Sequence, residues 1–227
     1  MDDEISKNVT KTGTLTIGII CKDGIVVAAD KKQSYAAGGG GVAYIAGSAK
    51  KIEEVNERVI ITTAGNASDS RKVIDILRSE MRIRELRTRT KASVGEFASL
   101  AANMLFQNIR TPSMIPSIAH FLIAGYDQEG EHLFDVSPDG YIQAIDNYAA
   151  TGSGIMQAHP ILDSEYKTGM SVDEGIKLAV KCIKAATARD PGVGIGINLY
   201  VVRKDHFEQV LDQTAVYELK ESSNKYK

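Results

Sequence analysis

A glycine–threonine step near the start of the chain, Gly13–Thr14, carries the residues best suited to chemistry. Cleavage between them would leave Thr14 with a hydroxyl nucleophile and a free α-amine on the same residue. The pKa of an α-amine is near ~8, so a useful fraction is neutral at physiological pH and can accept the hydroxyl proton. A threonine whose own terminal amine acts as the base is a known form of activated nucleophile.

A plainer interpretation competes with this one. Threonines alternate from Thr10 to Thr16, and threonine favours strands. On its own, such a period-two pattern is typical of the polar face of an edge strand. The rest of the sequence has to decide between a nucleophile and a strand.

Further polar residues are candidates to assist Thr14, namely Asp30, Lys51, Ser153 and Asp190. Asp30 ends an apolar run that a turn places beside Thr14, and Asp190 ends a predicted helix. The run Thr151-Gly152-Ser153-Gly154 lacks the first glycine of the serine-hydrolase motif. The glycines at 192–196 precede a strand instead of following one, so they do not match a dinucleotide-binding fingerprint.

The elements that must position these residues alternate between strands and helices. Apolar β-rich runs predict strands at 14–21, 25–30, 59–64, 120–126, 132–136, 141–146, 195–203 and 206–210. Helical spacing predicts helices over 68–86, 93–108 and 171–188.

Turn and cap signals punctuate these elements. Lys22-Asp23-Gly24 predicts a hairpin turn. Ser68 is the expected N-cap of the first helix, and Ser171-Val172-Asp173-Glu174 matches a capping box. Pro112 and Pro116 break the chain. Because no strand–helix–strand alternation is present, the pattern predicts an α+β protein with mostly antiparallel sheet.

Bulk properties exclude several classes of function. The chain has 227 residues, 43% of them hydrophobic, and a net charge of −2, which predicts a single globular domain over 14–221 without a general attraction to nucleic acid or membrane. Polar segments at 1–13 and 222–227 flank this domain. No apolar stretch reaches the ~18 residues of a membrane span, and the acidic start lacks the layout of a signal peptide.

Two smaller features have plain explanations. Cys21 and Cys182 lie far apart in apolar runs, so we expect buried side chains rather than a disulfide or a metal site, in keeping with a cytoplasmic location. The basic stretch at 82–91 is interleaved with glutamates and carries no aromatic residues. We expect a solvated face or a subunit contact there rather than a nucleic-acid site.

Taken together, several blocks resemble the β-type subunits of the 20S proteasome, of the archaeal kind, which are N-terminal nucleophile hydrolases. The similarity extends from Thr14 to about Arg203, and the order and spacing of the blocks make it specific. The blocks are 14–19, 21–30, Lys50-Lys51-Ile52, Thr63-Ala64-Gly65, 150–154, 170–175 and Ala188-Arg189-Asp190.

The resemblance implies a role for each candidate. Thr14 would be the nucleophile, freed by self-cleavage after Gly13. The charge of Lys51 would lower the pKa of the hydroxyl, and Asp30 would keep Lys51 protonated. Ser153 and Asp190 would hold the amine and a water by hydrogen bonds.

The resemblance also implies how substrate is held. The backbone N–H of Gly65 would bind the oxyanion of the tetrahedral intermediate, a donor worth roughly 3 kcal/mol in comparable sites. The residues expected to flank the substrate, with Gly65, are Gln33, Ser34, Ala49, Glu53, Thr63 and Ala67.

At the level of the whole protein, the resemblance implies a four-layer αββα sandwich with two mostly antiparallel sheets. It implies a threonine endopeptidase that cleaves unfolded proteins inside stacked rings of α and β subunits. An ATP-dependent unfoldase would act through the α ring, and hydrolysis would need no metal or cofactor.

The chain also departs from the family pattern. Val193 stands where a serine is common, Pro191 replaces a small residue, and the segment containing Gly38–Gly41 is an insertion. Lys32 and Leu15 replace an arginine and a threonine. A non-catalytic β subunit that shapes the ring therefore stays open as an alternative. A bacterial single-type ring protease is a third interpretation, which the long third helix and the C-terminal strand and tail disfavour because that family is shorter.

Overall fold

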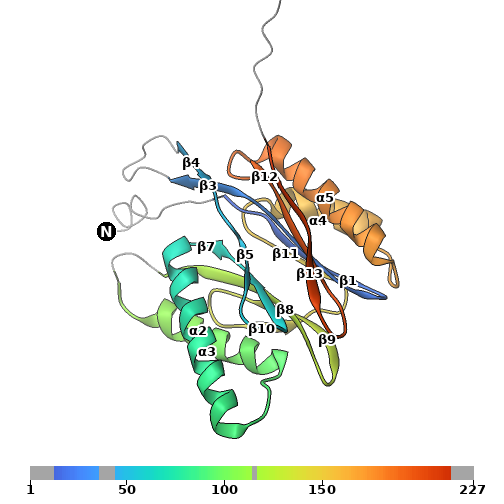
Figure 1. Cartoon of the computed structure of the whole chain (residues 1–227). Coiled ribbons are helices and arrows are strands. Elements are labelled where there is room, and N and C mark those ends of the chain that lie inside the picture. Colours follow the sequence, from blue (N-terminus) through green and yellow to red (C-terminus); the bar gives the residue numbers. More distant parts are fainter. Residues whose placement is uncertain (1–12, 36–43, 114–116, 216–227) are drawn as a thin grey trace, which may run out of the picture.

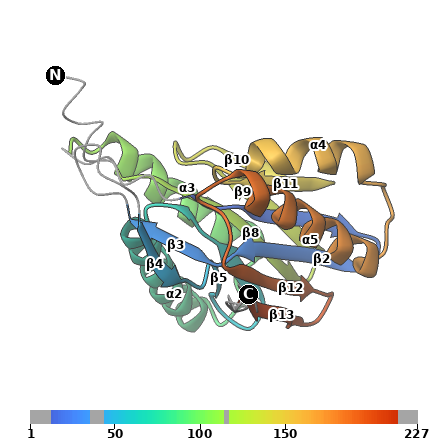
Figure 2. The ribbon, with the colours of Figure 1, turned by 90° about the horizontal axis from the view of Figure 1, so that it is seen from above.

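The computed structural model describes residues 13–35, 44–113 and 117–215 as two β-sheets packed face to face, each covered by helices on its outer side (Figure 1). The view from above shows the helices α4 and α5 on one side of the sheets and α2 and α3 on the other (Figure 2). The predictions for residues 1–12, for Gly38–Gly41, for Pro116 and for the tail at 222–227 lie outside the described residues.

The first sheet carries the start of the domain. Its strand order is β11-β1-β2-β12-β13, and all neighbouring strands are antiparallel. The strands are β1 (Thr16–Cys21), β2 (Gly24–Asp30), β11 (Tyr148–Thr151), β12 (Gly196–Val202) and β13 (Phe207–Thr214). Cys21 pairs with Gly24, so the predicted hairpin turn between β1 and β2 is confirmed.

The second sheet has the order β10-β9-β8-β6-β5, with β7 pairing beside β8. The strands are β5 (Ile52–Glu54), β6 (Val59–Thr62), β7 (Ala64–Gly65), β8 (Ala119–Asp127), β9 (Gly130–Val136) and β10 (Ile142–Ala144). A separate antiparallel pair is formed by β3 (Lys32–Tyr35) and β4 (Tyr44–Ser48).

The helices begin where their caps dictate. They are α2 (Ala67–Thr88), α3 (Val94–Arg110), α4 (Ile155–Glu165) and α5 (Val172–Arg189). The predicted capping box of Ser171 and Glu174 is present at α5. The N-cap predicted at Ser68 is wrong, because the Asn66 side chain accepts from the Ser68 N–H at 3.0 Å and caps α2 two residues earlier.

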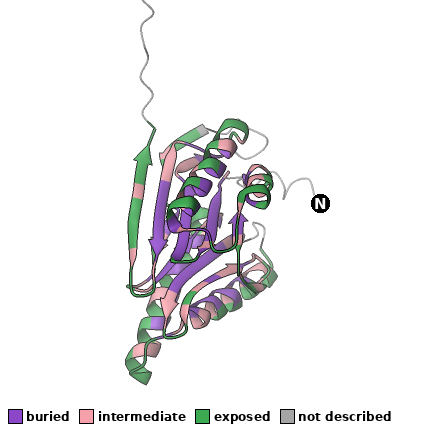
Figure 3. Cartoon of the chain, turned by 90° about the vertical axis from the view of Figure 1, so that its right-hand side faces the viewer, coloured by how far each residue is buried: buried purple, intermediate pink, exposed green. Residues whose placement is uncertain are grey.

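Three apolar clusters fill the spaces between the layers. One lies between the two sheets, and the other two lie between each sheet and its helices. In β2 the side chains of Ile25 and Val27 enter the cluster between the sheets, whereas Val26 and Ala28 enter the one beneath α5. The strand is buried on both faces, which explains its unbroken apolar sequence. Buried residues follow the central strands, whereas the edge strand β13 and the outer helix faces are mostly exposed (Figure 3).

Some strands and one helix were not predicted from the sequence. The short strands β3, β4, β5 and β11 carry too little pattern, and α4 contains Pro160 and has no side-chain N-cap. The predicted strands and long helices are confirmed within a few residues of their ends. None of the helices in the described ranges is long and apolar enough to cross a membrane.

Candidate active site

Thr14 lies immediately before β1 and is buried, with 4% of its surface exposed. The β1–β2 hairpin brings Asp30 beside it, because the backbone N–H of Leu15 donates to Asp30 Oδ1 at 2.9 Å. The other carboxylate oxygen of Asp30 accepts from the backbone N–H groups of Lys32 and Gly194, each at 3.0 Å. These donors fix the position of the Asp30 carboxylate.

Lys51 completes the buried centre of the site. Its Nζ lies 2.7 Å from Asp30 Oδ1 and 3.1 Å from Thr14 Oγ1. Burial lowers the pKa of Lys51 below its ordinary value of 10.5, since desolvation disfavours the ammonium, and the Asp30 carboxylate acts in the opposite direction. A cation is thus held against the Thr14 hydroxyl by a carboxylate that is itself anchored to the backbone.

A second chain of hydrogen bonds reaches the nitrogen of Thr14. The Thr14 N–H donates to Ser153 Oγ at 3.2 Å, and the Ser153 hydroxyl donates to Asp190 Oδ2 at 2.5 Å. Asp190 is positioned as the C-cap of α5, where its backbone N–H donates to the Ala186 carbonyl. The sequence candidates Thr14, Ser153 and Asp190 therefore lie together.

The turn after β11 holds the Thr14 backbone. Gly152 has φ +97°, and a Cβ there would lie 2.2 Å from the Thr14 carbonyl oxygen. The same oxygen accepts from the Gly154 N–H at 3.1 Å. Only glycine fits at position 152, so both glycines of this motif serve the placement of Thr14.

The chain is continuous through Gly13–Thr14, and the Gly13 carbonyl faces the same centre. Its oxygen accepts from Thr14 Oγ1 at 2.7 Å and from Lys51 Nζ at 3.2 Å. In this uncleaved state the nitrogen of Thr14 is a peptide nitrogen and has no lone pair available as a base.

A cleft with a cavity volume of about 110 Å³ opens beside Thr14. Six of the residues expected to flank the substrate line this cleft, namely Gln33, Ala49, Glu53, Thr63, Gly65 and Ala67. Ser34 does not line the cleft and is 6% exposed.

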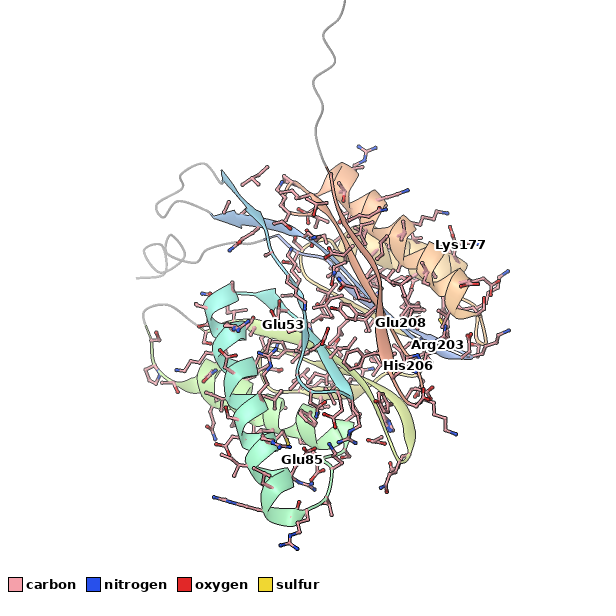
Figure 4. All side chains as sticks on the ribbon, in the orientation of Figure 1. Glu53, Glu85, Lys177, Arg203, His206 and Glu208 are labelled. Carbon is pink, nitrogen blue, oxygen red and sulfur yellow. The ribbon has the colours of Figure 1, made fainter. Side chains whose placement is uncertain are left out.

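The cleft wall includes an ion-paired carboxylate. Glu53 contacts Arg71 at 3.4 Å and Arg78 at 3.0 Å, and these two arginines belong to α2. Figure 4 shows Glu53 beside that helix. Gly65 has φ +100°, and a Cβ there would meet the Ile118 carbonyl oxygen at 2.5 Å, so the backbone of β7 approaches β8 closely at the cleft.

The departures from the family pattern have definite places. Val193 is 3% exposed and belongs to the apolar cluster beneath α5, so it offers the site no polar side chain. The Lys32 side chain donates to the Pro191 carbonyl. Leu15 is fully buried in the same apolar cluster as Val193.

A buried threonine network was missed in the sequence. Thr16 Oγ1 lies 2.7 Å from Thr151 Oγ1 and 3.0 Å from Thr62 Oγ1, and Thr62 Oγ1 accepts from the Leu122 N–H at 3.1 Å. The edge-strand interpretation is wrong for Thr16, because β1 lies between β11 and β2 and Thr16 is fully buried. Its hydroxyl joins the two sheets.

Both cysteines are buried and unpaired, as expected. Burial raises the pKa of Cys21 to about 11 and that of Cys182 to about 12. At neutral pH they are protonated thiols, which are poor nucleophiles.

Comparison with known proteins places this geometry in a family. Residues 10–202 match the family model described as "Proteasome subunit". Proteasome subunit beta of Methanopyrus kandleri is 32% identical over 208 residues, which are 91% of this chain and 95% of the relative. Proteasome subunit beta 2 of Pyrococcus furiosus is 38% identical over 197 residues, 87% of this chain and 90% of the relative. Proteasome subunit beta of Archaeoglobus fulgidus is 34% identical over 197 residues, which are 87% of this chain and 88% of the relative.

The αββα sandwich with its antiparallel sheets defines the class as the N-terminal nucleophile hydrolase fold. Within that class the matches cover most of the chain and most of each relative. The chain belongs to the proteasome subunit family and is a β-type subunit of the 20S core.

Proposed function

We propose that this subunit is a threonine endopeptidase that cleaves unfolded proteins inside the proteasome core after removal of residues 1–13. The observation that carries the proposal is the buried arrangement of Thr14 Oγ1, Lys51 Nζ and Asp30 Oδ1, with separations of 3.1 Å and 2.7 Å. A buried ammonium beside a hydroxyl stabilises the alkoxide that forms when the proton leaves.

Acylation uses the amine that self-cleavage creates. The Thr14 amine accepts the Oγ1 proton as Oγ1 forms a bond to the substrate carbonyl carbon. The oxyanion of the tetrahedral intermediate accepts from the Gly65 N–H. The carbon–nitrogen bond then breaks, the amine of Thr14 returns the proton to the leaving nitrogen, and an ester on Thr14 remains.

Deacylation repeats these steps with water. The Thr14 amine accepts a proton from a water whose oxygen attacks the ester carbon. The ester bond breaks, Oγ1 recovers the proton, and the carboxylic acid product leaves. Ser153 and Asp190 orient the amine during both halves, since Ser153 Oγ lies 3.2 Å from the Thr14 nitrogen.

Self-cleavage uses the same nucleophile on the chain itself. Thr14 Oγ1 forms a bond to the Gly13 carbonyl carbon, the bond between that carbon and the Thr14 nitrogen breaks, and the Oγ1 proton passes to the freed nitrogen, which leaves an ester. Water then hydrolyses the ester, so that Oγ1 recovers a proton and the segment leaves as a carboxylic acid. The Gly13 carbonyl oxygen, 3.2 Å from Lys51 Nζ, is already polarised toward a cation.

In this proposal the subunit acts in the cytoplasm within stacked rings of α and β subunits. An ATP-dependent unfoldase reaches it through the α ring. Specificity then depends mainly on admission to the inner chamber, with the cleft beside Thr14 holding the residue before the cleaved bond.

A non-catalytic subunit is the second candidate, and Val193 favours it. A serine is common there in the family, whereas this chain buries an apolar side chain at that point. In that case Gly13–Thr14 persists in the assembled particle, and the subunit shapes the ring without cleaving peptides.

The deciding experiment measures the assembled particle. Intact-mass analysis is expected to show the loss of residues 1–13, and a fluorogenic peptide is expected to be hydrolysed. Thr14→Ala should abolish both, while Thr187→Ala, on the exposed face of α5, should leave both unchanged. Persistence of residues 1–13 together with absent hydrolysis would contradict the enzyme and support the structural subunit.

A further inference from the structure

Two glycines from distant parts of the sequence touch through their backbones at the cleavage site. A Cβ added to Gly192 would lie 2.3 Å from Gly13 Cα and 3.0 Å from Gly13 N. A Cβ added to Gly13 would lie 2.1 Å from Gly192 Cα and 2.5 Å from its carbonyl carbon. Gly192 has no positive φ, so the contact, rather than backbone conformation, excludes a side chain from that position.

The loop that carries Gly192 is held from several sides. The Gly192 N–H donates to Asp190 Oδ1 at 2.7 Å, and the Val193 N–H donates to the Asp190 carbonyl at 3.1 Å. The Lys32 side chain donates to the carbonyl of the residue before Gly192. These hydrogen bonds hold the backbone at position 192 in place. A side chain added there would therefore displace Gly13 rather than the loop.

Displacing Gly13 would move the bond to be cut. The Gly13 carbonyl oxygen lies 2.7 Å from Thr14 Oγ1 and 3.2 Å from Lys51 Nζ. Because reaction rates fall steeply when reacting atoms are misplaced by even 1 Å, this alignment needs the close approach that two glycines allow.

We propose that Gly192 is a positioning residue for self-cleavage, which seats Gly13 against the α5–β12 loop so that its carbonyl faces Thr14 and Lys51. This inference rests on the proposed function and deepens it. After cleavage Gly13 has left, and the contact no longer exists. The absence of a side chain at position 192 therefore matters in maturation and not in the later hydrolysis of peptides, in which the backbone N–H that donates to Asp190 Oδ1 is kept whatever the residue.

The test separates the two reactions in the assembled protein. Full chains carrying Gly192→Ala or Gly13→Ala are followed by intact mass for loss of residues 1–13. Each should be cleaved at least about tenfold more slowly than the wild type, a change that corresponds to about 1.4 kcal/mol of added barrier. Gly95→Ala is the matched control, because a Cβ there meets its nearest atom at 3.8 Å.

A second set of chains begins at Thr14, released from a fused leader by a site-specific protease. In this form Gly192→Ala should hydrolyse a fluorogenic peptide within about twofold of the wild-type rate, because no residue 13 remains to be displaced. The Gly13→Ala chain yields the same mature product as the wild type, so slow cleavage in that variant cannot come from a misfolded mature domain.

Wild-type cleavage rates in both variants would overturn the role of Gly192 while leaving the enzyme intact. An equal loss of activity in the Gly192→Ala chain that begins at Thr14 would also overturn it, since the residue would then serve the mature site. If the wild-type chain is not cleaved and the chain that begins at Thr14 is inactive, the proposed function itself fails.

Discussion

At the residue scale, Lys51 is the group on which the site depends. Its side chain is 8% exposed and that of Asp30 is fully buried. The Asp30 carboxylate accepts hydrogen bonds from three backbone N–H groups and from Lys51. A buried ion pair of this kind is weak evidence for stability, but removing one partner leaves an uncompensated charge. We interpret the pair as the arrangement that holds the Lys51 ammonium beside Thr14.

Lys51→Met is therefore expected to affect both catalysis and stability. On a chain that begins at Thr14, kcat/KM for a fluorogenic peptide should fall by about 10²- to 10³-fold, the loss typical of one electrostatic group. The free energy of unfolding, measured with urea, should fall by about 3–5 kcal/mol because Asp30 stays buried without its partner. Lys181→Met, at a side chain that is 57% exposed, is the control and should change neither. Unchanged kcat/KM in Lys51→Met would refute the proposed role.

The pH dependence of hydrolysis should report the lowered pKa of Lys51. Burial makes the folded-state pKa lower than the ordinary 10.5, so the ammonium is lost as pH rises through a value below 10.5. Since the charged form assists Thr14, kcat/KM should decline on the alkaline side before pH 10.5 is reached. Profiles of kcat/KM against pH on the mature chain measure this, and a decline centred at or above 10.5 would contradict it.

The same shift has a consequence for folding. In the pH range between the folded and unfolded pKa values of Lys51, the unfolded chain binds more protons. The contribution of this residue to stability therefore rises with pH across that range, in the opposite direction to its effect on activity. As pH rises through this range, kcat/KM should consequently fall while the contribution of Lys51 to the free energy of unfolding grows.

At the scale of elements, the site is assembled where strands of both sheets end. β1 and β2 bring Thr14 and Asp30 together, the segment before β5 brings Lys51, and the turn between β11 and α4 brings Ser153. The hydroxyls of Thr16, Thr62 and Thr151 join β1, β6 and β11 beneath the site. This network links the two sheets beneath the point where Thr14, Asp30 and Lys51 meet.

Thr16→Val should weaken the contact between the two sheets at the hydroxyl network of Thr16, Thr62 and Thr151. Valine has nearly the same shape, but it leaves the hydroxyls of Thr62 and Thr151 without their shared partner in a buried place. The expected loss in the free energy of unfolding is about 1–3 kcal/mol. Thr187→Val on the exposed face of α5 is the matched control. Equal stabilities of the two variants in urea unfolding would show that the network carries no energy.

At the scale of the whole molecule, the surface carries large apolar side chains that a lone chain leaves in water. Exposed fractions are 76% for Met156, 63% for Tyr141, 62% for Leu86 and 59% for Ile45. These four side chains lie on different elements, namely α4, the segment before β10, α2 and β4. For a proteasome subunit, we expect several of them to be buried when the particle forms.

Met156, on the outer face of α4, offers the clearest test. Met156→Glu places a charge on this exposed apolar side chain, so it should lower the assembled fraction measured by native mass spectrometry by about tenfold, as for a centrally placed interface residue. The thermal unfolding of the unassembled chain should not change, since the residue is exposed. Assembly at the wild-type level would place Met156 outside the subunit contacts.

The sequence predicted the long elements well because their signals are local. Apolar periodicity and the capping box at Ser171 and Glu174 need only neighbouring residues, and α5 begins where the box indicates. The β1–β2 hairpin follows from Asp23-Gly24 in the same way. By contrast, α4 lacks a side-chain cap and contains Pro160, so packing against α5 and β11 sustains it instead of local propensity.

For the site, the residue types at Thr14, Asp30, Lys51, Ser153 and Asp190 could be read from the sequence with the help of the family resemblance. Their contacts could not, because the hydrogen bond between Ser153 and the Thr14 nitrogen joins residues 139 positions apart. The network around Thr16 was hidden because an alternating threonine pattern looks the same on an edge strand and in a buried junction.

The amino-acid sequence alone determined the α+β class and the positions of the long helices, since both depend on residue type and short-range spacing. Thr14 was singled out as a candidate N-terminal nucleophile only with the family resemblance. Only the tertiary structure decided that Lys51 is buried against Thr14, that Thr16 joins the two sheets, and that Gly192 meets Gly13. Burial and contact between distant segments depend on how the layers pack, and no pattern along one stretch of chain encodes them.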